Sequence, residues 1–320
     1  MYASPCPRRA LALGLMLALA ACGGRERAAG GVRADIVADP NGTAATYDVS
    51  RVVCVSKQIN EYIYAIGAQG HLVARDLTSI YPPQIRSLPS VGYHRALSAE
   101  GITSIRPTLF LTDGNVGPDA VLAELRKVGI PILVLDPGRS ADSAQALLAK
   151  LGKLFQRESA ADSVLSTWRA GMKAALGDSA RWSGQPRPRV LVMHFGQIIN
   201  NYLAVARGGP TDQIIRWAGG VNAIDSVGGM TRLTPELIAR AAPDVIIATD
   251  VGFDRVGSVA RFAALPGVAL TPAGRSGRIV RVDETEVMHF GPRTPGTVRK
   301  LAALLHPGAG AQTATAAGRP

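Results

Sequence analysis

The sequence predicts an α/β fold in which two lobes are joined by one long helix. Short apolar runs rich in β-branched residues alternate with helical patterns, and this alternation favours parallel sheets covered by helices. One helical pattern in mid-chain, over residues 158–181, is far longer than the others. A segment before this long pattern and a segment after it share the same order of residues, which indicates two lobes of similar construction.

Six apolar runs are typical of buried strands, and six segments between them have helical periodicity. The expected strands are 52–56, 109–112, 132–135, 190–194, 245–249 and 279–282. The expected helices are 60–66, 118–128, 140–154, 211–218, 235–241 and 294–305. Cys54 lies within the first strand, so we expect it to be a core residue.

The long pattern carries Leu165, Trp168, Met172 and Leu176 at spacings of three and four, with no proline. A continuous helix of 24 residues would span roughly 36 Å and connect two lobes rigidly. The alternative is a pair of shorter packed helices broken near Gly171.

The repeated segment carries a hydroxyl residue, a glutamate two residues later, a proline seven residues after that, and then an apolar strand. Its first copy contains Ser98 and Glu100, and its second copy contains Thr234 and Glu236. Ser98 and Thr234 suit helix N-caps, and an acid in the first turn is favoured by the helix dipole. Glu100 and Glu236 are therefore either helix-start acids or two equivalent contacts for a symmetric partner.

The N-terminus has the order of an export signal: Arg8 and Arg9, an apolar run over 10–21, and then Cys22. The run is too short to span a bilayer as a stable helix. It resembles a lipoprotein signal, in which Cys22 is lipidated; a plain signal peptide and a twin-arginine signal are the alternatives. Because Cys6 leaves with the signal, Cys54 has no cysteine left for an intramolecular disulfide.

These features divide the chain into a signal peptide, a tether, two lobes, a connecting helix and a disordered tail. The expected boundaries are 1–21 for the signal peptide, 22–48 for the lipidated cysteine and flexible tether, 49–157 for the N-terminal lobe, 158–182 for the interlobe helix, 183–307 for the C-terminal lobe and 308–320 for the tail.

The chain is basic, with a formal net charge of +11, and removal of residues 1–21 leaves +9. This balance suits an anionic ligand or surface. The arginines form no dense run and few aromatics lie among them, so nucleic acid is not indicated. No nucleotide-binding loop, nucleophile elbow, His-Glu-x-x-His or Cys-x-x-Cys occurs in the sequence, which argues against an enzyme. A hydrolase whose residues assemble in space is the enzymatic alternative.

Together, the signal, the two lobes, the connecting helix and the paired glutamates resemble the substrate-binding proteins of cobalamin, siderophore and haem importers. The resemblance covers about residues 49–307. Three runs are similar to the haem-binding branch: the first, 89–101, includes Gly92-Tyr93-His94-Arg95, and the others are 217–222 and 290–295. The resemblance implies a class III periplasmic binding protein architecture, in which two Rossmann-like lobes are joined by a single long rigid helix.

By this resemblance, Tyr93 is the axial ligand of a haem iron. A phenolate oxygen is a hard anionic donor that favours ferric iron. We expect Arg95, two residues further along an extended chain, to share a face with Tyr93 and to stabilise the phenolate. His94 is then expected to point the other way.

The second axial ligand is left open among His194, His94, His289 or none. His194 ends an expected strand of the second lobe, where ligands of open α/β sheets gather. His289 occupies a position where the haem branch has an aliphatic residue. Arg293 or Arg207 are candidates to pair with the haem propionates.

The resemblance implies that haem is a transported ligand, not a catalytic cofactor. The expected protein is a monomeric periplasmic or cell-surface lipoprotein, attached to the membrane only through Cys22. Its partners would be haem and an ABC permease dimer with its ATPase, and Glu100 and Glu236 would dock on the permease. The alternatives are a siderophore or cobalamin binder of the same fold, and a signalling receptor.

Overall fold

The computed structural model describes residues 33–38, 44–182, 184–195 and 202–307 of the 320. The expected signal peptide, Cys22 and the expected tail 308–320 lie outside these ranges. None of the helices within them is both long enough and apolar enough to cross a membrane.

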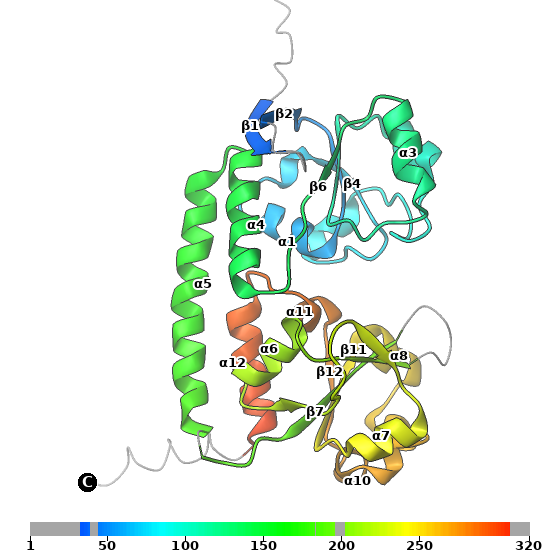
Figure 1. Cartoon of the computed structure of the whole chain (residues 1–320), viewed down its shortest axis with the longest axis vertical. Helices are drawn as coiled ribbons and strands as arrows, with labels where there is room; N and C mark the ends of the chain where they lie inside the picture. The colour runs from blue at the N-terminus through cyan, green and yellow to red at the C-terminus, as the bar shows by residue number, and fades with distance from the viewer. Residues whose placement is uncertain (1–32, 39–43, 183, 196–201, 308–320) are drawn as a thin grey trace, which may run out of the picture. The chain divides into compact units, whose positions relative to one another are not determined.

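The first lobe contains a parallel sheet of four strands in the order β4-β3-β5-β6 (Figure 1). Its strands are β3 (Val52–Val55), β4 (Leu72–Arg75), β5 (Leu109–Thr112) and β6 (Ile132–Val134). Its helices are α1 (Lys57–Ala65), α2 (Ala99–Ser104), α3 (Ala120–Lys127) and α4 (Ala141–Leu154). This arrangement is the parallel α/β sheet that the alternating pattern predicts.

The second lobe contains a mixed sheet in the order β10-β8-β7-β11-β12, with β9 paired to β7. Its strands are β7 (Arg189–Phe195), β8 (Tyr202–Val205), β9 (Val221–Asn222), β10 (Met230–Arg232), β11 (Val245–Thr249) and β12 (Ile279–Val282). Strands β7, β9, β11 and β12 are parallel, whereas β8 runs antiparallel to both β7 and β10. The expected parallel arrangement therefore holds for these four strands, and β8 adds an antiparallel strand beside β7.

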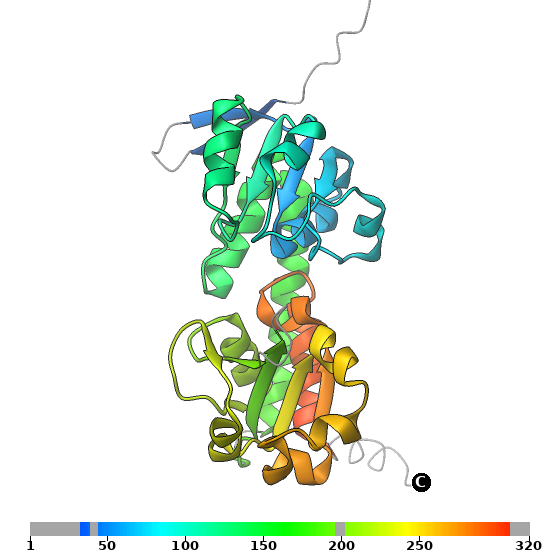
Figure 2. The same ribbon diagram turned by 90° about the vertical axis from the view of Figure 1, so that its right-hand side faces the viewer.

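Figure 2 shows the two sheets separately, the first in colours from blue to blue-green and the second in green, yellow and orange. Helices of the second lobe follow its strands along the chain. These helices are α6 (Pro210–Trp217), α7 (Pro235–Ala241), α8 (Asp250–Val256), α9 (Val259–Ala263), α10 (Pro272–Ser276), α11 (Glu284–Met288) and α12 (Thr294–Leu305).

The long mid-chain helix is continuous. Helix α5 runs from Glu158 to Ser179 without a break at Gly171, so the alternative of two shorter helices is wrong. It packs against α4 of the first lobe and α12 of the second (Figure 1). Leu165 belongs to the core of the first lobe and Met172 to that of the second. One helix therefore contributes side chains to both cores.

The central strands β3, β5 and β11 are buried on both faces, which explains why they are continuous apolar runs. In β3, Cys54 packs into a different core cluster from its neighbours Val53 and Val55, and all three side chains are almost fully buried. The prediction that Cys54 is a core residue is confirmed. In β11, Ile246 and Ile247 likewise enter opposite clusters.

Part of the segment expected to be a flexible tether forms a ribbon. Strands β1 (Arg33–Ala38) and β2 (Ala44–Asp48) pair in antiparallel register. The sequence analysis did not identify these strands, which are defined by their pairing with each other.

Candidate functional site

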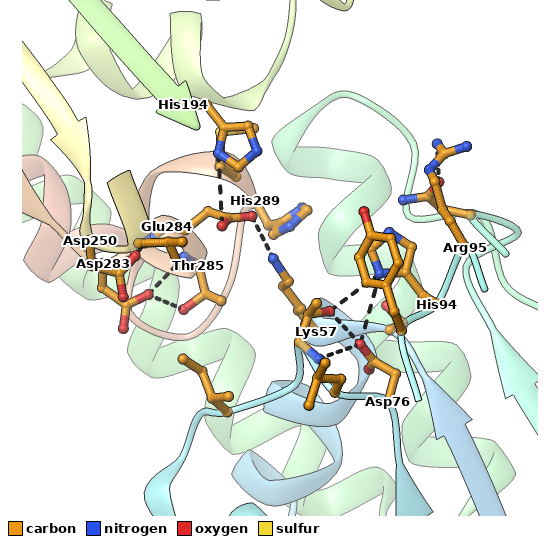
Figure 3. Close-up of a pocket in the computed structure, with 18 of the residues that line it drawn as sticks. Lys57, Asp76, His94, Arg95, His194, Asp250, Asp283, Glu284, Thr285 and His289 are labelled. Atoms are coloured by element: carbon orange, nitrogen blue, oxygen red, sulfur yellow. Dashed lines mark hydrogen bonds and ion pairs between the residues drawn. The ribbon is translucent and has the colours of Figure 1, made fainter. Parts of the chain in front are cut away.

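A cavity of about 540 Å³ lies between the carboxyl ends of strands from both sheets. It is lined by Ser56 after β3 and by Asp113 after β5 of the first lobe. His194 in β7, Asp250 after β11 and Asp283 after β12 line it from the second lobe. The volume falls within the ~300–1,000 Å³ of small-molecule sites, and the carboxyl edge is where open α/β sheets bind ligands. Figure 3 shows the polar side chains of this cavity.

A tight turn places both Tyr93 and His94 on the cavity wall. Gly92 has φ +101°, a conformation that favours glycine, and the N–H of Ala96 donates to the carbonyl of Tyr93 at 2.7 Å. The rings of Tyr93 and His94 lie 4.4 Å apart between centroids, tilted by 59°. The expectation that His94 points away is wrong, because the chain turns here instead of continuing extended.

Arg95 also lines the cavity, but not for the reason expected. It belongs to the same turn, and its Nη2 donates to Asn115 Oδ1 at 2.5 Å. Its side chain is exposed, so it lies at the open side of the cavity. The turn, and not an extended strand, brings Arg95 and Tyr93 to one wall.

A buried carboxylate lies behind His94. Asp76 is 1% exposed and accepts hydrogen bonds from the Thr78 N–H at 2.9 Å and from the hydroxyls of Thr78 and Ser79. His94 Nδ1 lies 3.4 Å from Thr78 Oγ1 and 4.0 Å from Asp76 Oδ2. Desolvation lowers the pKa of His94 although Asp76 opposes the shift. The imidazole is therefore neutral at pH 7, the form that binds metals.

His194 reaches the cavity from the second lobe. It is the last but one residue of β7, and its Nδ1 lies 3.5 Å from Thr249 Oγ1 and 3.8 Å from Glu284 Oε2. Burial lowers the pKa of His194 despite the nearby carboxylate of Glu284. The second lobe therefore also presents a neutral imidazole.

An ion pair joins the two lobes inside the cavity (Figure 3). Lys57, the first residue of α1, places its Nζ 2.5 Å from Oε1 of Glu284, the first residue of α11. Desolvation alone would raise the pKa of Glu284, but the charge of Lys57 and its hydrogen bond to the carboxylate outweigh it and hold the pKa below its usual range. Sequence reasoning missed this pair, because nothing in the sequence links residues 227 positions apart.

His289 is a third histidine on the cavity wall. Burial and the charge of Lys57 together lower the pKa of His289 to about 4, against the attraction of Asp113 and Glu284. The structure thus brings three of the five histidines, His94, His194 and His289, to the same cavity as Tyr93.

The segment after His289 binds the first lobe through its backbone. The carbonyl oxygen of Phe290 accepts hydrogen bonds from Gln58 Nε2 at 2.8 Å and from the Tyr62 hydroxyl at 3.0 Å. The next carbonyl, of Gly291, accepts from Trp168 Nε1 of α5 at 3.1 Å. The run 290–295, which is similar to the haem-binding branch, therefore includes residues that connect the two lobes.

The two arginines considered as propionate partners are engaged elsewhere. Arg293 pairs with the buried Glu61 through Nε at 3.0 Å and Nη2 at 2.9 Å, and it covers the ring of Tyr81 at 3.5 Å. Arg207 pairs with Asp225 at 2.8 Å. Neither arginine lines the cavity, so the structure does not favour that role for either.

The repeated segments form the capped helices that the sequence predicts. Ser98 accepts a hydrogen bond from the Gly101 N–H and caps α2, and Thr234 accepts one from the Leu237 N–H and caps α7. Glu100 and Glu236 hold the same position in the first turn of these helices, and both are exposed. Each helix leads into an internal strand of its sheet, β5 or β11.

Two further observations limit the chemistry of the site. In the ranges that the structure describes, no group of three or more His, Cys, Asp or Glu side chains is arranged to hold a metal ion. The cavity has apolar side chains among its polar ones, namely Val55, Leu77, Ile80, Leu203, Met230, Val251 and Met288. This lining suits a ligand with apolar faces.

Comparison with known proteins gives one family and several relatives. The sequence profile of a family described as "Periplasmic binding protein" matches residues 52–286. The structure is similar to that of the periplasmic heme-binding protein RhuT from Roseiflexus sp. RS-1, with 32% identity and a TM-score of 0.72, over 80% of this chain and 97% of that one.

Similarity extends to two more proteins. A periplasmic heme-binding protein from Pseudomonas aeruginosa is 29% identical with a TM-score of 0.74, over 81% of this chain and 94% of its own. The vitamin B12-binding protein of Photorhabdus laumondii is 34% identical over 97 residues, which is 30% of this chain and 35% of that protein. The match to this curated relative therefore spans about a third of its length. The expected architecture of two α/β lobes and one long helix is confirmed.

Proposed function

Since this chain belongs to the periplasmic binding protein family, we propose that it is an extracytoplasmic haem-binding protein that delivers haem to an ABC-type import permease. The observation that carries the proposal is the position of Tyr93 on the wall of a cavity that also holds neutral histidines and apolar side chains. RhuT and the Pseudomonas protein, whose solved structures are similar to this one, are both named heme-binding proteins, and this supports haem as the ligand.

In the proposed complex, the Tyr93 phenolate binds ferric haem iron from the first lobe. A phenolate is a hard donor suited to ferric iron, and the guanidinium of Arg95 in the same turn stabilises its charge. His194 is the proposed second axial ligand. Its Nδ1 is directed to Thr249 and Glu284, which leaves Nε2 for the iron.

Binding, and not turnover, is the proposed activity. Haem is cargo here, and the chain acts as a monomer that presents it to a permease dimer driven by an ATPase. Glu100 and Glu236 are proposed to dock on that dimer, because they hold equivalent exposed positions in the two lobes. Cys22 is the proposed site of lipid attachment to the membrane.

The test is an absorbance titration of the full-length chain with ferric hemin, compared with Tyr93→Ala. Wild type is expected to give a saturable one-to-one Soret change with the charge-transfer band of phenolate-bound ferric haem, and Tyr93→Ala to lose that band. His194→Ala is expected to keep the band but to shift the spectrum towards five-coordinate, high-spin haem. Identical unsaturable spectra for wild type and Tyr93→Ala would sink the proposal.

A cobalamin binder of the same fold is the second candidate, because the Photorhabdus relative is named a vitamin B12-binding protein. Cobalamin does not require a tyrosine ligand. The same titration with cyanocobalamin separates the two functions: saturable binding that is unchanged in Tyr93→Ala, together with no hemin binding, would favour the second candidate.

A further inference from the structure

Helix α1 of the first lobe carries two opposite charges that both pair with the second lobe. Lys57 and Glu61 lie four residues apart, so they are neighbours one turn apart on the same helix face. Lys57 pairs with Glu284 of α11. Glu61 pairs with Arg293, which directly precedes α12. The two pairs therefore join the same helix to the second lobe with opposite polarity.

The Glu61–Arg293 pair belongs to a dense set of directed contacts. Arg293 donates to both carboxylate oxygens of Glu61, at 3.0 Å and 2.9 Å, and Glu61 is buried. The carbonyl of Phe290 accepts two more hydrogen bonds from α1, donated by Gln58 and Tyr62. A planar guanidinium that makes two parallel bonds fixes orientation as well as distance. This part of the interface therefore holds the lobes in a defined register.

Helix packing strengthens the same part of the interface. Helix α5 packs against both α4 and α12, and its Gly171 lies against Pro295 of α12. Trp168 of α5 donates to the carbonyl of Gly291. Figure 1 shows α4, α5 and α12 on one side of the two sheets, and α3 and α7 on the other side. The lobes are therefore joined most firmly on the side of α5.

The Lys57–Glu284 pair lies in the cavity and has a weaker geometry. A single contact of 2.5 Å joins Lys57 Nζ to Glu284 Oε1, and the two side chains are 16% and 17% exposed. Both residues line the cavity, and they meet across it from opposite lobes (Figure 3). A lysine ammonium is a point charge on a flexible stem, so it fixes no orientation. Water competes for such a partly exposed pair, which is therefore easier to break than the bidentate pair of Glu61.

We propose that the Glu61–Arg293 contact is a pivot between the lobes, and that the Lys57–Glu284 pair is a latch across the ligand-free cavity. Because the two pairs lie one helical turn apart on α1, a rotation about the pivot separates the latch. The closed latch limits the width of the cavity, and its opening admits a ligand. The motion belongs to the protein without ligand, so the inference does not depend on which ligand the cavity takes.

The first test measures the distance between the lobes in the ligand-free full-length chain. Nitroxide labels are attached at Glu124→Cys in α3 and Arg240→Cys in α7, two exposed positions on the side away from α5. Cys6→Ser and Cys22→Ser remove the other thiols outside the core, and Cys54 stays unlabelled because it is buried. Pulsed electron paramagnetic resonance then gives the distribution of distances between the labels.

The latch is removed in this labelled chain by Lys57→Met, which replaces the ammonium by an apolar group of similar length. The intact latch is expected to give a narrow distribution, and Lys57→Met a broader one shifted to longer distances. Lys57→Arg keeps the cation and is expected to match the intact chain. Lys153→Met removes an exposed lysine of α4 outside the cavity lining, and it is expected to change nothing. Identical distributions with and without Lys57→Met would overturn the inference.

Hydrogen exchange separates the pivot from the latch. The amides of Gly291 and Thr294 are hydrogen-bonded beside Arg293. Their exchange is expected to be the same in wild type and in Lys57→Met, because the contacts of this segment with α1 persist while the latch is open. Faster exchange there in Lys57→Met would show that the lobes separate at both pairs, and it would rule out the pivot.

The rate of hemin association tests whether the latch limits entry. Lys57→Met is expected to raise the association rate constant by roughly two- to fivefold, the effect of losing one partly exposed ion pair. An unchanged rate in a variant whose lobes open would exclude a role of the latch in entry. Failure of wild type to bind hemin would contradict the proposed function instead, and the distance measurement would still decide the inference.

Discussion

His289 couples the cavity to the acid stability of the protein. Its pKa in the folded protein is about 4, because burial and the charge of Lys57 disfavour the imidazolium, whereas an unfolded chain restores the ordinary value of 6.5. Between these values the unfolded state binds a proton that the folded state does not. The free energy of unfolding therefore falls as the pH drops from about 6.5 to about 4, and this contribution is constant below that range.

We expect His289→Gln to flatten this part of the stability profile. Between pH 6.5 and pH 4, the free energy of unfolding should fall by up to about 3 kcal/mol more in the wild type than in the variant. Chemical denaturation of both proteins without ligand at several pH values measures this difference. At pH 8 the imidazole is neutral in the folded and the unfolded state, so the difference in the free energy of unfolding between wild type and variant there gives the effect of the substitution on packing alone. Parallel profiles for variant and wild type across this range would contradict the assignment.

Sequence reasoning could name part of the cavity but not its electrostatics. Tyr93 and Arg95 were identifiable because they belong to a short motif, and His194 because it ends an apolar strand. Lys57 and Glu284 carry no such signal, since their ion pair exists only when helices from the two lobes meet. His94 was placed incorrectly because the pattern does not reveal that the chain turns at Gly92.

At the scale of elements, α5 contains two glycines with opposite surroundings. A Cβ at Gly171 would lie 2.9 Å from Cβ of Pro295 in α12, closer than such atoms approach, whereas a Cβ at Gly177 would meet nothing within 4 Å. Gly171 therefore permits close contact between α5 and the second lobe, while Gly177 only weakens the helix.

Alanine substitution should consequently have opposite signs at the two positions. Gly171→Ala is expected to destabilise the fold by about 1–3 kcal/mol through overpacking, and Gly177→Ala to stabilise it by about 0.4–1 kcal/mol through helix propensity. Urea denaturation of both variants provides the comparison, with each acting as the control for the other. Stabilisation by both would show that α12 yields easily to the added methyl group.

Apolar strands buried on both faces were predictable to within a few residues, as β5, β11 and β12 illustrate. Strands β8 and β10 were not, because neither is a fully buried apolar run. In β10 the first and last residues are exposed, and the antiparallel pairing with β8 defines the strand. The capped helices α2 and α7 were predictable because their caps and first-turn acids depend only on local chemistry.

At the scale of the whole molecule, the paired glutamates predict a docking function separate from ligand binding. Joint replacement of Glu100 and Glu236 by alanine is expected to abolish haem uptake through the permease while leaving the hemin titration unchanged. Both side chains are exposed, and exposed charge pairs are screened over about 8 Å at physiological salt, so uptake by wild type should also weaken as salt rises.

Uptake into vesicles containing the cognate permease and ATPase measures this effect. Glu124→Ala, which removes another exposed helical glutamate of the first lobe, is the matched control. Loss of hemin binding in the Glu100 and Glu236 double variant would show instead that these residues maintain the fold.

The contacts of residues 290–293 with α1 also bear on the order in which the chain folds. A ribosome releases the chain from its N-terminus, so Tyr62 emerges 228 residues before the carbonyl of Phe290 that it binds, and Glu61 emerges 232 residues before Arg293. Burial raises the pKa of Glu61 even with Arg293 in place. In a nascent chain that ends before Arg293, the carboxylate of Glu61 in the first lobe therefore lacks its native counter-charge. The lobe that is synthesised first therefore gains these contacts only after residues 290–293 of the second lobe have been made.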